Sequence, residues 1–244
     1  MRVLRSLVFW TAVVLWTLFL LSAACLVSGL TLGLLRHRLI NVFAPLYGPP
    51  LLWVAGIHLE AHGMAHLATP SARIVAFNHN SFLEVPLLSA LNVPRFTWLG
   101  KRSFFYIPVL GQAMWLLGGH FIDRGHRKKA HASIQKLGAD LRRNRLSAYV
   151  APEGTRSRTG ELQPFKMGMF HLALDTGAPI VPMVIHGVHD LLEPDDWKVS
   201  PGTVRVEVHP PIDTSCWTRE SLHAEAERLH ADFARWLAAG PTPG

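Results

Sequence analysis

In residues 73–84, RIVAFNHNSFLE, a short apolar run typical of a buried strand is followed directly by a polar turn. The run itself is Arg73–Phe77. Leu146–Val150 (LSAYV) and Ile180–Ile185 (IVPMVI) have the same apolar character. Thr203–Val208 (TVRVEV) alternates apolar and polar residues, which is typical of a half-exposed strand near the edge of a sheet. We therefore predict a strand in each of these places.

Helical patterns alternate with the predicted strands. One apolar set steps by 4, 3 and 4 residues along one helix face: Ala130, Ile134, Leu137 and Leu141. A second set predicts a C-terminal helix that begins near Thr218: Leu222, Ala226, Leu229, Phe233 and Trp236. Because strands and helices alternate, the sequence predicts an α/β domain, a mixed β-sheet flanked by helices.

The N-terminus is unusually apolar, and no charged residue lies between Arg5 and Arg36. As a helix, residues 6–35 would be about 45 Å long, against a hydrocarbon thickness of about 30 Å. One membrane-spanning helix fits that length. The next apolar stretch, Val42–Ile57, contains three prolines and predicts a membrane-dipping or core segment. We expect a membrane-anchoring helical segment over residues 1–60 and the globular domain over residues 61–240.

A cleaved signal peptide is the alternative interpretation of this N-terminus. Arg2 and Arg5 precede the apolar run, and the small residues Ser22, Ala23 and Ala24 resemble a cleavage site. Apolar sequence continues well past Cys25, which a cleaved peptide would not need. The pattern therefore favours a retained anchor. Basic residues flank the run on both sides, so charge alone does not orient it.

The overall composition excludes several classes of protein. Of 244 residues, 49% are hydrophobic, which excludes intrinsic disorder. Two cysteines, Cys25 and Cys216, cannot form a disulfide scaffold. The net charge of +7 points to anionic membrane surfaces and small anionic substrates before nucleic acid. The basic residues between 127 and 145 predict a helix face that is either solvated or attracted to anionic headgroups.

The turn after the first predicted strand carries the pair His79 and Glu84. In a regular helix, residues five apart point in different directions, so the two can meet only if His79 lies in the turn and Glu84 in the first helical turn. With Ser81 as the N-cap, the Glu84 carboxylate would orient the imidazole as a general base. Alternatively, Ser81 and Glu84 form a capping box and His79 is an ordinary turn residue.

Two further segments carry basic residues next to turns. Residues 153–157, EGTRS, follow a predicted strand, so their backbone N–H groups and the Arg156 guanidinium could bind phosphate oxygens. A surface turn with a local Glu153–Arg156 pair is the alternative. In the FIDR segment at residues 121–124, Arg124 ends an apolar run, and Lys101 precedes an aromatic stretch.

Taken in order, these segments resemble the 1-acylglycerol-3-phosphate O-acyltransferases of the glycerolipid acyltransferase family. The matching pattern is His79-x4-Glu84, Lys101…Pro108…Gly111, Phe121-Ile122-Asp123-Arg124, Glu153-Gly154-Thr155-Arg156-Ser157, Pro164-Phe165-Lys166-x-Gly168 and Ile180-Val181-Pro182. The resemblance covers residues 73–188. The family normally has Asp where this chain has Glu84, so the carboxylate here must approach the imidazole with one more methylene.

The resemblance implies roles for single residues. His79 would take the proton from the attacking hydroxyl, and Glu84 would fix the tautomer of its ring. The substrate-binding set implied by the family pattern is Lys101, Arg124, Glu153, Gly154, Thr155, Arg156 and Lys166. Glu153 would orient Arg156 or a glycerol hydroxyl. No metal or cofactor is expected, because the histidines form no ligand-spaced cluster with Cys or Asp.

The resemblance also implies partners and a location. We expect transfer of a fatty acyl group from acyl-CoA or acyl-carrier protein to lysophosphatidic acid, among membrane lipids and without nucleic acid. The expected location is the inner or cytoplasmic membrane, with the catalytic domain on its cytoplasmic side. Two alternatives stay open: an acyltransferase for another lysolipid acceptor, and a non-catalytic, membrane-anchored lipid-binding protein.

Overall fold

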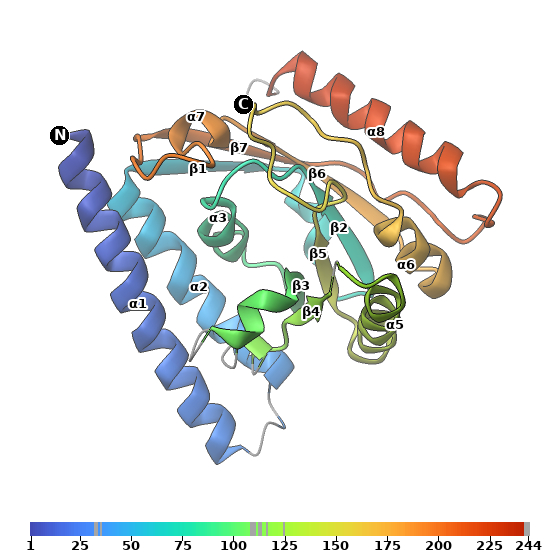
Figure 1. Cartoon of the computed structure of the whole chain (residues 1–244), viewed down its shortest axis with the longest axis horizontal. Helices are drawn as coiled ribbons and strands as arrows, with labels where there is room; N and C mark the ends of the chain where they lie inside the picture. The colour runs from blue at the N-terminus through green and yellow to red at the C-terminus, as the bar shows by residue number, and fades with distance from the viewer. Residues whose placement is uncertain are drawn as a thin grey trace.

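A single mixed sheet organises the protein in the computed structural model (Figure 1), which describes residues 1–31, 34, 36–107, 111, 114–115, 117–123 and 125–241. Within those residues the strand order is β1-β7-β6-β2-β5-β3-β4. The strands are β1 (Ile57–His62), β2 (Arg73–Phe77), β3 (Phe96–Lys101), β4 (His120–Ile122), β5 (Ser147–Val150), β6 (Ile180–His186) and β7 (Gly202–Val208). Neighbours are parallel except β6 and β7.

All four predicted strands are confirmed, as β2, β5, β6 and β7. The predicted position of β7 near a sheet edge is also confirmed, because only β1 lies outside it. No strand was predicted at β1, because its alternation of Ile57, Leu59 and Ala61 with polar residues lies in the stretch assigned to the N-terminal segment. The sheet therefore begins at Ile57, a few residues before the expected domain boundary at residues 60–61.

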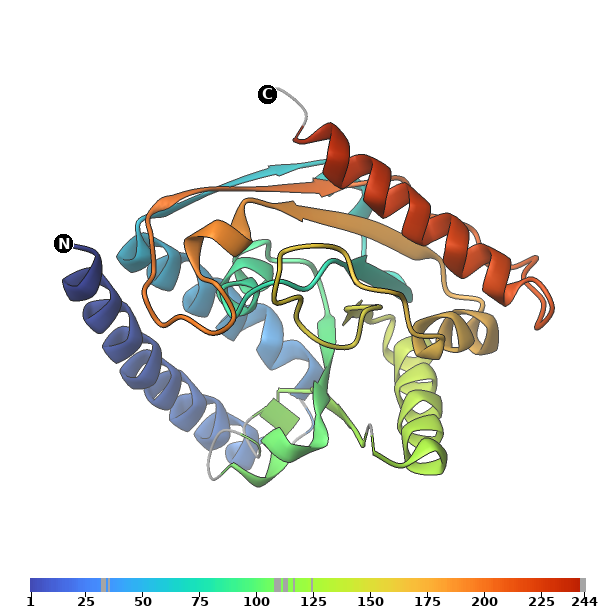
Figure 2. The same ribbon diagram turned by 45° about the horizontal axis from the view of Figure 1, so that its top comes forward.

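Helices cover both faces of the sheet (Figure 2). One face carries α1 (Arg2–Leu30), α2 (Arg36–Ala55) and α3 (Glu84–Ala90), and the other carries α5 (Arg127–Asn144), α6 (Gly168–Thr176) and α8 (Leu222–Ala239). The short helices are η1 (Met64–Leu67), η2 (Arg102–Tyr106) and α7 (Val188–Leu191). Alternate residues of β2 enter the two cores, Val75 on the first face and Ile74 on the second, as strand geometry requires. The predicted α/β class is confirmed.

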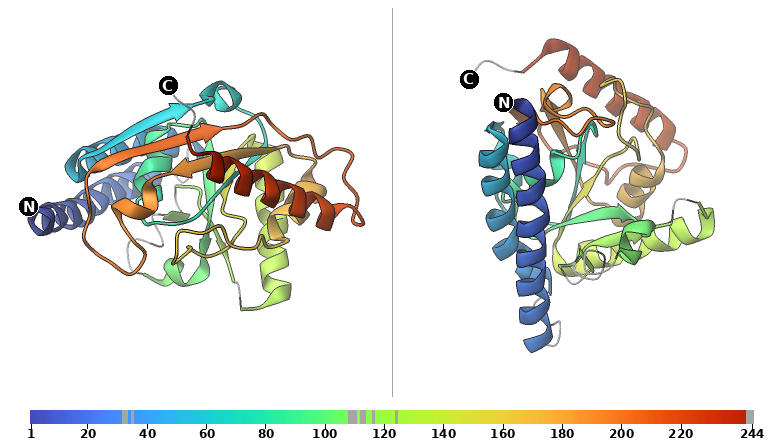
Figure 3. Two further views of the ribbon diagram at one scale, coloured as in Figure 1. Left: turned by 90° about the horizontal axis from the view of Figure 1, so that it is seen from above. Right: turned by 60° about the vertical axis from the view of Figure 1, so that its left-hand side comes forward.

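The two N-terminal helices run side by side along one flank of the molecule (Figure 3). In the part of the chain that the structure describes, α1 is the one helix long and apolar enough to cross a membrane. It is also tied to the globular domain, because the Trp10 indole N–H donates to the Trp197 carbonyl oxygen at 2.7 Å. The helix ends at Leu30, before the end of the uncharged run, and Thr31 follows it.

The second helix, α2, continues through Pro45, Pro49 and Pro50. Its inner face is buried in the core, whereas Val42, Leu46 and Trp53 on its outer face are exposed, so the stretch packs on the domain and its contact with a membrane stays a prediction. At Gly48 the helix comes so close to α3 that a Cβ would lie 2.4 Å from the Pro86 carbonyl oxygen.

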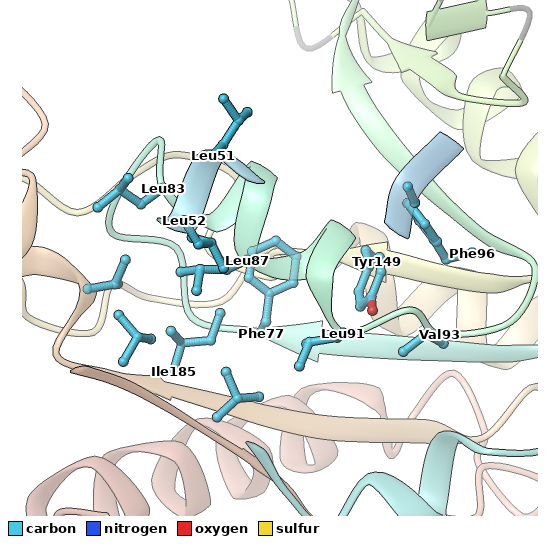
Figure 4. Packing of buried hydrophobic residues seen from close by; sticks show 14 of the residues in the cluster. Leu51, Leu52, Phe77, Leu83, Leu87, Leu91, Val93, Phe96, Tyr149 and Ile185 are labelled. Atoms are coloured by element: carbon cyan, nitrogen blue, oxygen red, sulfur yellow. The ribbon is translucent and has the colours of Figure 1, made fainter. Parts of the chain in front are cut away.

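Packing holds α3 between α2 and the sheet (Figure 4). Leu51 of α2, Leu87 of α3 and Phe77 of β2 belong to one buried cluster. Leu83 and Leu87 are fully buried, so the polar turn just before α3 is anchored by apolar contacts. The end of β2 and the start of α3 therefore have fixed relative positions.

Candidate active site

The site begins at Asn78, the first residue after β2. Its side chain is buried and bridges the backbone of Ile185 on the neighbouring strand β6: the Asn78 amide donates to the Ile185 carbonyl at 2.9 Å, and the Ile185 N–H donates to Asn78 Oδ1 at 2.8 Å. These two bonds fix where the turn leaves the sheet. No local sequence pattern indicates this role of Asn78, because its partner lies 107 residues away.

His79 and Glu84 meet, as the catalytic interpretation requires. His79 Nδ1 is hydrogen-bonded to Glu84 Oε2. The other carboxylate oxygen, Oε1, accepts the backbone N–H of Asn80 at 2.5 Å and of Ser81 at 2.9 Å. The side chain of Glu84 is 2% exposed and that of His79 is 30% exposed. A buried carboxylate thus holds a partly exposed imidazole.

The predicted helix start is wrong by a few residues. Helix α3 begins at Glu84, with Leu83 in the capping position, so Ser81 is not the N-cap. The reason is a tertiary contact: the Ser81 hydroxyl donates to the Leu192 carbonyl oxygen at 2.7 Å. The bond from the Ser81 N–H to Glu84 is nevertheless present. Glu84 therefore makes both kinds of contact at once: Oε2 bonds the His79 ring, and Oε1 bonds the backbone of the turn.

This arrangement determines the tautomer of His79. A carboxylate only accepts hydrogen bonds, so the proton of the neutral imidazole lies on Nδ1. The Nε2 atom then carries a lone pair, the group that a general base needs. A carboxylate at Nδ1 can stabilise the imidazolium that forms if Nε2 takes a proton.

Glu153 lies inside the site rather than on its surface. It is 1% exposed, and its two oxygens accept backbone N–H groups, from His79 at 2.7 Å and from Gln163 at 2.9 Å. Burial raises the pKa of the Glu153 carboxyl, and the two hydrogen bonds oppose that rise. The expectation that Glu153 orients Arg156 or a glycerol hydroxyl is therefore replaced: the carboxylate positions the backbone of His79.

The EGTRS segment is hydrogen-bonded to the turn that contains His79. The Ser157 N–H donates to the His79 carbonyl oxygen at 2.8 Å, so the backbone of His79 is held on both sides. Thr155 and Arg156 are exposed between these two anchor points. The sheet thus brings Arg156 next to His79, although the two are far apart in sequence.

The Lys166 side chain lies against the backbone of Gly154 in the EGTRS segment. Gly154 has a φ of +70°, and a Cβ built there would lie 2.9 Å from Lys166 Cδ and 3.1 Å from Nζ. The Lys166 N–H donates to the Pro152 carbonyl at 2.8 Å. Glycine is needed here both for the left-handed backbone and for the close lysine. Lys166 and Arg156 therefore put two cations on one loop.

Comparison with known proteins shows which family this chain belongs to. The family described as Acyltransferase matches residues 58–186, which include β2, α3 and the EGTRS segment. The chain belongs to this family. The acyltransferase activity expected from the sequence is thereby confirmed at the level of enzyme class.

Several curated relatives of the acyltransferase are named 1-acyl-sn-glycerol-3-phosphate acyltransferase. The protein from Limnanthes douglasii is 30% identical over 97% of this chain and 87% of its own length. The protein from Escherichia coli is 34% identical over 80% of this chain and 76% of its own. The crystal structure of the 1-acyl-sn-glycerophosphate acyltransferase PlsC from Thermotoga maritima has the same fold, with a TM-score of 0.80, 24% identity and full coverage of both chains.

One further predicted binding residue of the acyltransferase, Lys101, lies at the end of a strand beyond β5. Lys101 ends β3 and is exposed. Because β2, β5 and β3 are parallel neighbours, Lys101 shares the carboxyl edge of the sheet with His79. Arg124 and Pro108 lie outside the described residues. Among the residues that are described, no three His, Cys, Asp or Glu side chains are placed to hold a metal ion.

Proposed function

We propose that this acyltransferase transfers a fatty acyl group from an acyl thioester, acyl-CoA or acyl-carrier protein, to the sn-2 hydroxyl of 1-acylglycerol-3-phosphate. The product is phosphatidic acid, an intermediate of phospholipid biosynthesis. The observation that carries this proposal is the bond from His79 Nδ1 to buried Glu84, beside the cationic EGTRS loop. The names of the relatives support the choice of acceptor.

The reaction needs a base and then an acid at one atom, and His79 Nε2 supplies both. Nε2 takes the proton of the acceptor hydroxyl while the oxygen attacks the thioester carbonyl. The tetrahedral intermediate collapses, the C–S bond breaks, and the leaving thiolate receives the proton from the imidazolium. Because the alcohol attacks directly, no covalent acyl-enzyme is required.

Cations around His79 suit a phosphate-bearing acceptor. Arg156 offers a planar fork that can bind two phosphate oxygens, and Lys166 adds a second charge from the same loop. Lys101, the last residue of β3, lies at the same carboxyl edge of the sheet as His79. We assign the acceptor phosphate to Arg156, Lys166 and Lys101, with Arg124, Gly154 and Thr155 as further binding residues implied by the family pattern.

The apolar outer face of α1 supports membrane association. Its exposed side chains include Leu4, Leu15, Phe19 and Leu26, each at least 61% exposed. A row of exposed apolar side chains is costly in water and favourable in lipid. We propose that this face lies in the membrane that holds the lysolipid. Because acyl-CoA and acyl-carrier protein are cytoplasmic donors, we place the site on the cytoplasmic side of the inner membrane.

The test is an acyl-transfer assay on the purified full-length chain in detergent. Labelled acyl-CoA and acyl-carrier protein are each offered with a panel of lysolipids. We expect labelled phosphatidic acid from lysophosphatidic acid, and the donor that supports it identifies the donor class. Product from another lysolipid alone would overturn the acceptor assignment, and no product from any pair would overturn the proposed reaction.

A further inference from the structure

A hollow of about 410 Å³ lies beside the edge strand β4, between η2 and α5. It is lined by Arg102, Phe105, Trp115, Gly119, His120, Phe121, Lys129, Ala132, Ser133 and Lys136. Strand β4 is three places from β2 in the sheet order, so the hollow is separate from the His79 site. None of the groups used in the proposed reaction lines it.

The charged side chains among the described residues that line this hollow are all cations. Arg102, Lys129 and Lys136 are exposed, and no carboxylate is among the described residues that line it. Lys129, Ser133 and Lys136 recur at helical spacing, so they present two ammonium groups and a hydroxyl along one face of α5. Grouped cations of this kind attract an anion with several negative oxygens.

The opposite wall of the hollow is aromatic. Phe105 is 36% exposed and Trp115 is 45% exposed, and Phe105 meets Phe121 edge-on with ring centroids 5.5 Å apart. Exposed aromatic rings beside cations are the combination that proteins use to stack a base and hold its phosphates. A glycerolipid headgroup has no aromatic ring that could stack on such a wall.

We infer that this hollow binds the nucleotide end of the acyl donor, the phosphorylated adenosine of acyl-CoA. The adenine would stack on the aromatic wall, and the phosphates would pair with Lys129, Lys136 and Arg102. This inference rests on the proposed function, because it names the donor for that reaction.

The distance across the sheet fits this assignment. Strands β2, β5, β3 and β4 are parallel neighbours, so their carboxyl ends share one edge. Three inter-strand spacings put strand β4, which lines the hollow, about 14 Å from β2. In CoA the pantetheine arm separates the thioester from the nucleotide. The thioester can therefore reach His79 while the nucleotide stays beside β4.

Two matched double variants test the inference in the full-length chain. Lys129→Gln with Lys136→Gln removes two charges from the hollow. Lys128→Gln with Arg143→Gln removes two charges from exposed positions of the same helix, outside the hollow. Binding of adenosine 3′,5′-bisphosphate is measured by calorimetry at two salt concentrations, and KM is measured for acyl-CoA and for lysophosphatidic acid.

We expect the first pair to weaken nucleotide binding and to raise the KM for acyl-CoA by about tenfold or more, with the acceptor KM unchanged. The control pair should stay within about twofold of wild type in both assays. Equal nucleotide binding by the two pairs, or no nucleotide binding by wild type, would overturn the inference. Binding of each variant to phosphatidylglycerol vesicles is measured as well. If the Lys129 and Lys136 pair loses vesicle binding but keeps nucleotide binding, the hollow is a headgroup site and the inference is overturned. Calorimetry needs no turnover, so it separates failure of this site from failure of the proposed reaction.

Discussion

Replacing Glu84 by Gln separates the two bonds that this side chain makes. The amide oxygen of Gln can still accept the N–H groups of Asn80 and Ser81, as Oε1 does in the protein. The amide NH₂ then faces His79 Nδ1, where Oε2 accepts now. A donor facing Nδ1 moves the ring proton to Nε2, which removes the lone pair that acts as the base. If the amide rotates, NH₂ faces two backbone donors instead.

The size of the effect follows from these bonds. A general base contributes about 10²–10⁴-fold to the rate, and a wrong-tautomer substitution of this kind in a serine protease triad costs about 10⁴-fold. We expect kcat of Glu84→Gln to fall by about 10²–10⁴, which is about 3–5 kcal/mol of barrier. Loss of a charge-assisted hydrogen bond also lowers the free energy of unfolding by about 1.5–3 kcal/mol, or several degrees in Tm.

The assay is turnover of a labelled acyl donor with saturating acceptor, alongside thermal unfolding. Glu84→Asp is the matched control, because it keeps the negative charge and shortens the side chain by one methylene. It should retain more turnover than Glu84→Gln. Turnover of the Gln variant within about twofold of wild type would refute the orienting role, and a lower Tm with that turnover would leave Glu84 as a structural residue of the turn.

Further variants test the rest of the site and its support. His79→Ala should lower turnover by about 10²-fold or more with little change in Tm, and activity above about a tenth of wild type would exclude it as the base. Glu153→Gln places an amide donor against a backbone N–H, so kcat should fall while the acceptor KM stays constant; a higher acceptor KM at constant kcat would return Glu153 to substrate binding. Arg156→Ala should raise the KM of the phosphate-bearing acceptor, and a rise in donor KM instead would assign Arg156 to the donor. Gly48→Leu would drive a side chain into Pro86, so Tm should fall by an amount equivalent to about 1–3 kcal/mol, and an unchanged melting curve would show that the helices separate easily.

Local patterns were enough to predict much of the fold. The runs that became β2, β5 and β6 are mostly apolar, and the run that became β7 alternates apolar and polar residues, so a strand can be inferred at each from the sequence alone. The short strand β4 has no such signal, and the alternation in β1 lies in the stretch assigned to the N-terminal segment. The pairing of β1 with β7 joins residues about 145 positions apart, which no local pattern encodes.

The sequence alone determined which side chains are candidates for the chemistry, because His79, Glu84, Arg156 and Lys166 stand in motifs whose residue types suit acyl transfer and phosphate binding. Only the tertiary structure decided what Glu153 does. The residue type of Glu153 and its neighbours in sequence suggest a contact with Arg156. In the folded protein, however, the carboxylate is buried in the turn that follows β5, and both of its oxygens accept backbone N–H groups. Burying the Glu153 carboxylate without these hydrogen bonds would be costly. Its role therefore depends on its two backbone partners, one of which, His79, is 74 residues away in sequence.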